Sequence, residues 1–256
     1  NAVVCSFFTP TSCVTLRNNQ YDSGTPPTSA TSDPLLRTTN GAQLRLIRAQ
    51  LADNRSRLSM LDAFLSASVR LDASIISANQ VDVNTLASAQ GTQFARSLTT
   101  AKVRLNQSTV LFETPLDRFF RIEGTGSAVV LASALASTPT VAPANFGGGA
   151  AAANFTRERC GYFRRTDDLA GTTVVNDPGL GAFGLASGPS PELDPVSFSP
   201  TSALLIDRCT SSAAPDRDYY GNAFGFQYYA GSSVFADIGA VEAQLPNDII
   251  FANGFD

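Results

Sequence analysis

The sequence predicts an all-β fold in which short parallel strands stack in successive coils. Only 16% of the 256 residues are charged, against about 25% in typical domains, and few are the Glu and Lys that cover the exposed faces of helices. Apolar and polar residues alternate along several segments with the two-residue period of a strand. Similar segments also recur about every 25 residues, which is typical of a solenoid.

The first forty residues are expected to be rich in loops. Residues 22–28 are a run of turn formers, and Asp33-Pro34 is a second break. Residues 13–19 (Cys-Val-Thr-Leu-Arg-Asn-Asn) form a short strand-like run within this region. The sequence therefore predicts one early strand and several turns before the main coils.

Residues 41–140 carry four copies of one pattern. Each copy opens with an apolar residue, any residue and then Leu. The copies begin at Leu44, Val69, Val103 and Val129, so they are spaced by 25, 34 and 26 residues. Residues 13–19 are a weaker fifth copy. A repeat of this length with insertions matches one coil of two or three strands.

Two interpretations compete for these copies. In the second copy, residues 69–75 alternate apolar and polar side chains, and Val103-Arg-Leu-Asn106 does the same. This alternation places Arg and Asn outside and Val and Leu in the core, so we favour strands. The helical alternative places four residues of the first copy on one face: Leu44, Ile47, Leu51 and Leu58.

Asparagines end the first two copies. Asn54 and Asn79 occupy equivalent places, and an Asn at a coil corner can adopt a left-handed conformation and bond to the coils stacked on it. We therefore expect both residues at corners between strands.

The rest of the chain is expected to be irregular. Residues 141–156 are rich in Ala and Gly and predict a flexible loop. Residues 157–245 are rich in Gly, Pro, Asp and aromatics and predict a closing cap of the same domain, and residues 246–256 form a short tail.

The four cysteines fall into two neighbourhoods, one near each end of the chain. Their positions suggest Cys5–Cys13 and Cys160–Cys209 disulfides, and C-x-x-C metal spacing is absent. Disulfides imply an oxidising compartment. Four reduced, buried thiols are the alternative.

Four motifs in the C-terminal third resemble a known family. In order they are Asn-Asp-Pro-Gly-Leu at 176–180, Leu-Asp-Pro-Val-Ser-Phe-Ser-Pro-Thr-Ser-Ala-Leu-Leu-Ile-Asp at 193–207, Asp-Tyr-Tyr-Gly-Asn at 218–222 and Ala-Asp-Ile-Gly-Ala-Val-Glu at 236–242. This segment resembles the closing part of secreted bacterial right-handed parallel β-helix proteins of the choice-of-anchor Q, or polymorphic outer-membrane-like, group. The resemblance implies a right-handed parallel β-helix with an irregular C-terminal cap, and it implies no particular reaction.

The resemblance and the tail predict where the protein works. Residues 250–256 (Ile-Phe-Ala-Asn-Gly-Phe-Asp) are similar to a terminal element of secreted proteins of some Gram-negative bacteria. We expect a product that is secreted or displayed on the outer-membrane surface of such a bacterium. The chain begins at Asn1 without a Met or signal peptide, as expected of a mature product or a fragment.

Composition excludes several classes of function. The chain has no His, so a histidine base or an imidazole metal ligand is excluded. Lys102 is the one lysine, and its surroundings suit neither a Schiff base nor a P-loop. A pI of about 4.9 makes nucleic acid an unexpected partner, and no apolar run of membrane-spanning length is present.

Three aspartates and an aromatic cluster are the remaining candidate sites. Asp216, Asp218 and Asp237 either bind Ca²⁺ or cap turns, and we favour capping. Four tyrosines either contact sugars or pack under the cap: Tyr219, Tyr220, Tyr228 and Tyr229.

The function that we expect from the sequence is non-catalytic. The chain is interpreted as an extracellular structural or adhesive protein that contacts itself, a cell surface or a polysaccharide, and end-to-end assembly into filaments is a further hypothesis. The alternatives are a polysaccharide lyase or glycoside hydrolase, and a carbohydrate-binding module. Asp53, Asp72 and Arg104 are expected on an outer face where a lyase groove would lie. We expect no catalytic residue and no cofactor beyond the Ca²⁺ considered above.

Overall fold

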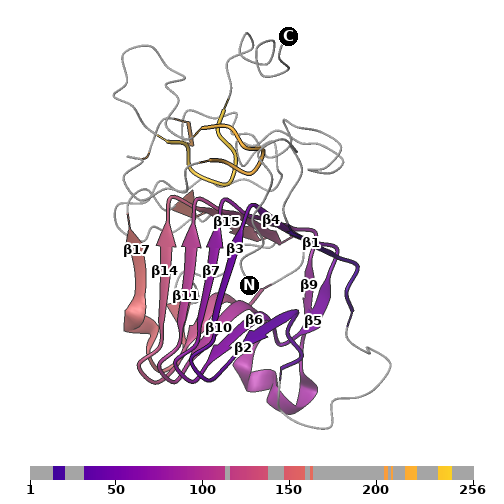
Figure 1. The fold of residues 1–256 in the computed structure, drawn as a ribbon. Coiled ribbons are helices and arrows are strands. Elements are labelled where there is room, and N and C mark those ends of the chain that lie inside the picture. Colours follow the sequence, from indigo (N-terminus) through magenta and orange to yellow (C-terminus); the bar gives the residue numbers. More distant parts are fainter. Residues whose placement is uncertain are drawn as a thin grey trace, which may run out of the picture.

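The computed structural model describes residues 14–20, 32–112, 116–137, 147–158, 162–163, 205–206, 209, 217–223 and 236–243. Within these ranges strands predominate and helical structure is limited to short 3₁₀ turns, which confirms the all-β prediction. The strands form three large parallel sheets (Figure 1). We call these sheets 1, 2 and 3 after the first strand of each.

Each sheet takes one strand from every repeat. Sheet 1 contains β1 (Val14–Arg17), β4 (Ala49–Ala52), β8 (Ile75–Ser77), β12 (Thr109–Phe112), β15 (Ala134–Ser137) and β18 (Tyr162–Phe163). Sheet 2 contains β2 (Leu36–Thr38), β6 (Ser59–Phe64), β10 (Gln93–Leu98), β13 (Arg118–Ile122) and β16 (Gly147–Gly148). Sheet 3 contains β3 (Gln43–Ile47), β7 (Ser68–Asp72), β11 (Lys102–Asn106), β14 (Ser127–Leu131) and β17 (Phe155–Glu158). From residue 36 onward the chain visits sheets 2, 3 and 1 in that order.

Two local additions interrupt this order. β5 (Arg55–Arg57) and β9 (Gln80–Asp82) form a small parallel sheet after the first two repeats. The 3₁₀ turn η1 (Thr85–Gln90) follows β9, and the Asn84 side chain caps it by accepting from the Leu86 N–H at 2.9 Å. Residues 83–92 are thus an insertion, and they explain why one spacing is 34 residues while Leu44 and Val69 are paired at a spacing of 25.

The inward side chains of all three sheets share one apolar core. Leu71 and Leu105 from sheet 3, Ile76 and Val110 from sheet 1, and Phe120 from sheet 2 are all below 2% exposed. On β7 and β11 the inward residues alternate with polar outward neighbours, as the strand interpretation predicted. Their burial drives the association of the three sheets.

The corners between sheets 3 and 1 are single left-handed residues. Arg48, Ala73, Gln107 and Ala132 have φ of 54°, 46°, 43° and 45°. Such a conformation is costly for non-glycine residues, but stacked hydrogen bonds offset the cost. Arg48 N–H donates to the Asp72 carbonyl at 2.9 Å, and Ala73 N–H donates to the Asn106 carbonyl at 3.0 Å.

Asparagines stack at the next corner, as expected. Asn54 Nδ2 donates to Asn79 Oδ1 at 3.0 Å, and Asn19 Nδ2 donates to Asn54 Oδ1 at 2.9 Å. The left-handed residues are the preceding Asp53 and Ala78, with φ of 55° and 52°, rather than the asparagines themselves. The amide side chains therefore stabilise the corner by bridging repeats.

Serines form a second, fully buried ladder. Ser108 Oγ accepts from Ser74 N–H at 3.2 Å, and Ser133 Oγ accepts from Ser108 N–H at 3.0 Å. Each hydroxyl also donates to a nearby carbonyl, as Ser133 does to Leu131 at 2.8 Å. The ladder satisfies backbone groups that would otherwise be buried without partners.

Two of the sequence alignments between copies were wrong. Val103 pairs with Ala128, not with Val129, so the fourth copy is shifted by one residue. The apolar run 128–131 hid the alternation that fixes which residue points inward. β1 also pairs with β4 in sheet 1, which makes residues 13–19 equivalent to the second strand of the copy rather than to its start.

The loop predicted over 141–156 contains part of a fifth repeat. β16 pairs with β13, and β17 pairs with β14 through Phe155 opposite Ala128. The Phe155 ring stacks on Phe120 at 5.4 Å between centroids, which extends the apolar core. Gly149, with φ of 94°, supplies the turn between these strands. This segment forms strands despite its low complexity, because Phe155 joins the core and Gly149 allows the turn between them.

The described parts of the predicted cap lie against the outer face of sheet 1. Ile75, Leu111 and Ala134 on that face pack with residues such as Leu205 and Ile238 in a second apolar cluster. In Figure 1 this closing segment (yellow and orange) lies above the strands of sheet 1. Its described residues therefore cover a side of the stack across several repeats.

Candidate functional site

Arginines occupy the same outward position on three neighbouring strands of sheet 3. Arg45, Arg70 and Arg104 are paired in register, because each copy reads apolar-Arg-Leu and the flanking apolar residues enter the core. The Arg45 side chain is 53% exposed and that of Arg70 is 35% exposed. Lys102 lies on the same face and is exposed. We call these four cations the sheet 3 basic row.

One buried carboxylate neutralises part of this row. Asp72 is fully buried and accepts from Arg45 Nε at 2.6 Å, from Arg70 Nε at 2.7 Å and from Asn106 Nδ2 at 3.0 Å. It therefore lies between two guanidinium groups and receives two charge-assisted hydrogen bonds and one amide hydrogen bond. Its role is therefore electrostatic and structural.

The far part of the row has no such neutralisation. Among the residues that the structure describes, Arg104 and Lys102 have no carboxylate within ion-pair distance. The Arg104 Nε–H is shielded from water and has no hydrogen-bond partner. Like charges directly opposite on neighbouring strands are also unfavourable. The positive charges of Arg104 and Lys102 are therefore not neutralised by a carboxylate among the described residues.

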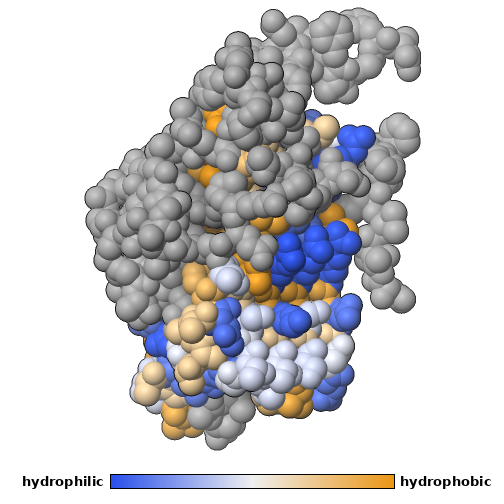
Figure 2. All heavy atoms as spheres, turned by 90° about the vertical axis from the view of Figure 1, so that its left-hand side faces the viewer, coloured by the Kyte–Doolittle hydropathy of each residue, from blue (hydrophilic) through white to orange (hydrophobic). Residues whose placement is uncertain are grey.

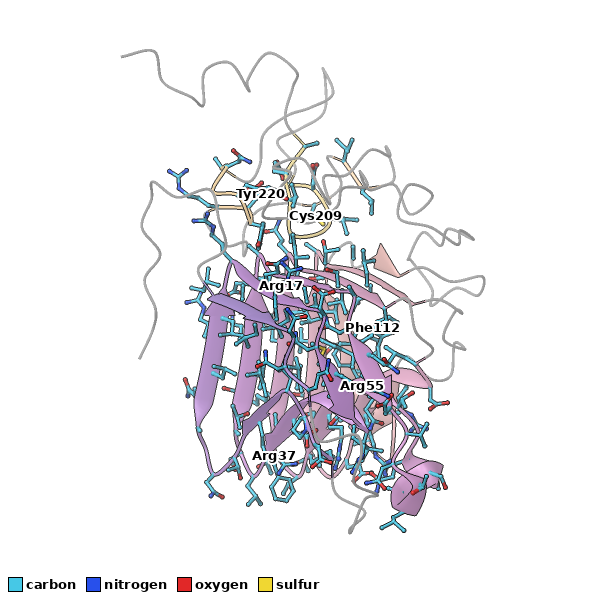
Figure 3. The ribbon with its side chains drawn as sticks, turned by 90° about the vertical axis from the view of Figure 1, so that its right-hand side faces the viewer. Arg17, Arg37, Arg55, Phe112, Cys209 and Tyr220 are labelled. Carbon is cyan, nitrogen blue, oxygen red and sulfur yellow. The ribbon has the colours of Figure 1, made fainter. Side chains whose placement is uncertain are left out.

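Sheet 2 carries a second row of charges. Arg37, Asp62, Arg96 and Arg121 pair in register on β2, β6, β10 and β13. Asp62 is 6% exposed and lies 3.5 Å from Arg37 Nη2 and 3.7 Å from Arg96 Nε. Arg121 Nε donates to Glu123 at 2.6 Å. In Figure 3 Arg37 lies at the bottom of the stack, far from the labelled Cys209 and Tyr220.

Burial perturbs Arg96 of this second row and Arg118, which lies on the same strand as Arg121. Desolvation lowers the pKa of Arg96, and the nearby Asp62 opposes the change. Desolvation, with the charge of Arg121, lowers the pKa of Arg118. Both groups stay cationic, since an arginine starts from a very high pKa.

Asp218 is one of the predicted site residues, and it caps backbone groups. Its carboxylate accepts from the N–H of Asn222 at 2.7 Å, from Asn222 Nδ2 at 3.0 Å and from the N–H of Glu242 at 3.1 Å. Burial raises its pKa to about 6 in spite of these hydrogen bonds. The contacts join residues 218–222 to residues 236–243.

Asp237 has a similar role in the last described segment. Its Oδ2 accepts from Ala243 N–H at 2.6 Å, and its own N–H donates to Glu242 at 2.9 Å. Within the described residues no group of three or more Cys, Asp or Glu is arranged to hold a metal ion. Asp216 lies outside the described ranges, so calcium binding by this trio stays a prediction.

The closing segment is attached to the strands through backbone and side-chain contacts. Buried Arg48 donates from Nε to the Tyr219 carbonyl at 2.9 Å, and Gln107 Nε2 donates to the Asp237 carbonyl at 3.3 Å. Thr109 Oγ1 accepts from Ala240 N–H at 3.0 Å. Two of the left-handed corner residues, Arg48 and Gln107, thus provide docking points.

Some of the predicted tyrosines and cysteines lie within the described residues, and the others do not. Tyr219 is fully buried and its ring meets Tyr220 edge-on at 5.0 Å between centroids, which fits packing under the segment better than sugar contact. Cys209 is buried and disulfide-bonded. The other predicted residues lie outside the described ranges, so their roles and the disulfide pairing stay predictions: Cys5, Cys13, Cys160, Tyr228 and Tyr229.

Sequence reasoning located part of this arrangement. Asp72 and Arg104 lie on one outer face, as expected, whereas Asp53 lies at a corner and pairs with Arg17 at 2.6 Å. The pairing of Asp72 with two arginines and the row on sheet 2 were missed. The sequence does contain a signal for the pairing of Asp72 with arginines, because Arg follows the first apolar residue in three copies.

Comparison with known proteins gives no match to this chain. No protein-family model matches the chain, and no curated protein or solved structure is significantly similar to it. No helix among the described residues is long and apolar enough to cross a membrane. Figure 2 shows that hydrophilic surface (blue) gathers in a patch bordered by hydrophobic surface on the described part of the molecule.

Proposed function

We propose that this chain is a non-catalytic structural and adhesive protein of the cell surface or extracellular space. In this proposal the three parallel sheets wind as a right-handed parallel β-helix, and the C-terminal motifs mark a relative of the choice-of-anchor Q group. The protein would be exported by a Gram-negative bacterium and would contact a cell surface, a polysaccharide or further copies of itself.

The stacked ladders are the observation that carries the proposal. The Asn19–Asn54–Asn79 and Ser74–Ser108–Ser133 ladders tie each repeat to the next through hydrogen bonds that run along the stack. Repeats joined this way form a regular support, and on sheets 2 and 3 its outer faces carry rows of polar side chains. A support of this kind suits display and contact.

End-to-end assembly is part of the same proposal. In the described residues, sheets 1, 2 and 3 begin at β1, β2 and β3 and end at β18, β16 and β17, each with one sheet neighbour. Strand edges of this kind template pairing with another chain. Electron microscopy of the purified native protein tests the idea, and filaments with a repeat equal to one chain are expected. A monodisperse monomer at all concentrations would exclude assembly.

The non-catalytic assignment has its own test. Acidic and neutral polysaccharides are incubated with the protein, with and without Ca²⁺, and the release of shorter chains is followed by chromatography. We expect intact polymer retained by the protein. Turnover that disappears in the Arg104→Ala variant would refute the assignment.

A carbohydrate-active enzyme is the second candidate, and one observation favours it. Arg96 is a guanidinium with a pKa lowered by burial beside the Asp62 carboxylate, and perturbed groups of this kind cluster at active sites. Turnover lost in Arg96→Gln but kept in Arg104→Ala would locate such a site on sheet 2.

A further inference from the structure

We infer that the outer face of sheet 3 binds an acidic polysaccharide along the basic row formed by Arg45, Arg70, Lys102 and Arg104. The inference rests on the proposed adhesive function and names the ligand class that the surface would take. It is carried by three features of the face: its charge, its regular spacing and the cations at one end that no described carboxylate neutralises.

The charge of the face is opposite to that of the whole chain. The protein has a formal net charge of -4, yet β3, β7 and β11 carry four outward cations and one carboxylate, that of Asp72. Asp72 accepts hydrogen bonds from Arg45 and Arg70, and it lies beneath them with no exposed surface. A ligand approaching this face therefore meets cations first.

The spacing of the cations is regular. Arg45, Arg70 and Arg104 are directly paired on adjacent parallel strands, so their Cα atoms are spaced by about 4.8 Å. Lys102 lies two residues before Arg104 on the same strand, about 7 Å away along β11. A straight, open row of this kind fits an extended polymer with an acidic group on successive residues.

The unneutralised end of the row points to what the ligand supplies. Among the described residues, Arg104 and Lys102 have no carboxylate within ion-pair distance, whereas Asp72 pairs with Arg45 and Arg70. Arginine binds carboxylates and sulfates through two parallel N–H donors. An acidic sugar placed over Arg104 and Lys102 would supply the missing negative charge and would reduce the repulsion between Arg70 and Arg104.

A polysaccharide fits the row better than nucleic acid does. Binding to a duplex draws on phosphate contacts spread over a wide basic surface, whereas this row is confined to three strands of an acidic protein. Duplex DNA is nevertheless included in the test as the rival polyanion.

The test compares two double variants with the same charge change. Lys102→Gln/Arg104→Gln removes the unneutralised end of the row and leaves Arg45 and Arg70 to hold Asp72. Arg17→Gln/Arg55→Gln removes two cations elsewhere, on β1 and β5, where each is paired with a carboxylate. The full chain is titrated with polygalacturonate, dextran sulfate, neutral dextran and duplex DNA at low and high salt.

We expect polygalacturonate and dextran sulfate to bind in a salt-dependent manner, and neutral dextran not to bind. The Lys102/Arg104 variant should lose about tenfold in affinity, as expected for charge-assisted contacts, while the Arg17/Arg55 variant should stay within about twofold. Both variants should keep the thermal midpoint of the parent, which shows that they fold.

Three results would overturn the inference. They are equal losses in the two variants, no loss in the Lys102/Arg104 variant, and tighter binding of DNA than of polygalacturonate at matched charge. If the protein binds polygalacturonate through Lys102 and Arg104 but does not attach to any cell surface, the inference holds and the proposed adhesive function is refuted.

Discussion

Replacing Asn79 with Ala should destabilise the protein strongly, because this buried side chain makes four hydrogen bonds. Its Nδ2 donates to the carbonyls of Leu51 at 2.7 Å and Ser77 at 2.8 Å. Its Oδ1 accepts from the N–H of Asn54 at 2.9 Å and from Asn54 Nδ2 at 3.0 Å. At about 1 kcal/mol for each net hydrogen bond, the loss is roughly 4 kcal/mol.

Thermal and urea unfolding measure this loss. A change of roughly 4 kcal/mol corresponds to about 10 °C in the midpoint for a chain of this size. Asn19→Ala is the matched control, since Asn19 is exposed at the end of the same ladder and its backbone N–H still reaches Asn54. It should cost less than about 1 kcal/mol. Equal effects of the two substitutions, or a cost below about 1 kcal/mol for Asn79→Ala, would refute the reasoning.

Three further predictions concern the closing segment and the core. A Cβ at Gly239, where φ is +118°, would lie 2.9 Å from Thr109 Oγ1, so Gly239→Ala should speed hydrogen exchange in residues 236–243 while sheet 3 stays protected; unchanged exchange in both would contradict this. The folded-state pKa of Asp218, about 6, lies above its unfolded value of 3.8. The stabilisation of the folded state that follows from this raised pKa is therefore fully present below pH 3.8 and is lost as the pH rises through 6. The melting midpoint should therefore be higher at about pH 5 than at about pH 8, and Asp218→Asn should reduce the difference; an unaltered pH profile in that variant would count against it. Phe94→Ala removes a ring packed at 6.0 Å from Phe112 and 5.9 Å from Phe120 and should cost about 4 kcal/mol in urea unfolding, with a cost near zero arguing against a packed core.

Alternation along the chain was enough to predict strands and their inner faces. In Val69-Arg-Leu-Asp72 each apolar residue enters the core and each polar residue stays outside. The same rule failed at residues 128–131, where every side chain is apolar and a shift of one residue leaves the pattern unchanged. The register of β14 on β11 determines which of these residues point inward, and that register depends on contacts between distant parts of the chain.

The position of the closing segment was only partly visible in the sequence. Ile75-Ile76 and Val110-Leu111 place apolar side chains on both faces of sheet 1, which is typical of a strand covered on both sides. That signal predicts a cover but not which segment provides it. The hydrogen bond from Arg48 to the Tyr219 carbonyl depends on a contact between distant parts of the chain, and no local pattern reports it.

The docking of the closing segment has a consequence for how the chain folds. The Arg48–Tyr219 and Gln107–Asp237 contacts span 171 and 130 residues, whereas successive strands of a sheet are close in sequence. Closing so long a loop is slow compared with stacking neighbouring strands, so the segment should dock last. Until then the stripe formed by Ile75, Leu111 and Ala134 faces water and is open to aggregation. The interval between completion of the strands and docking of residues 217–223 and 236–243 is therefore the period in which a chaperone would be needed.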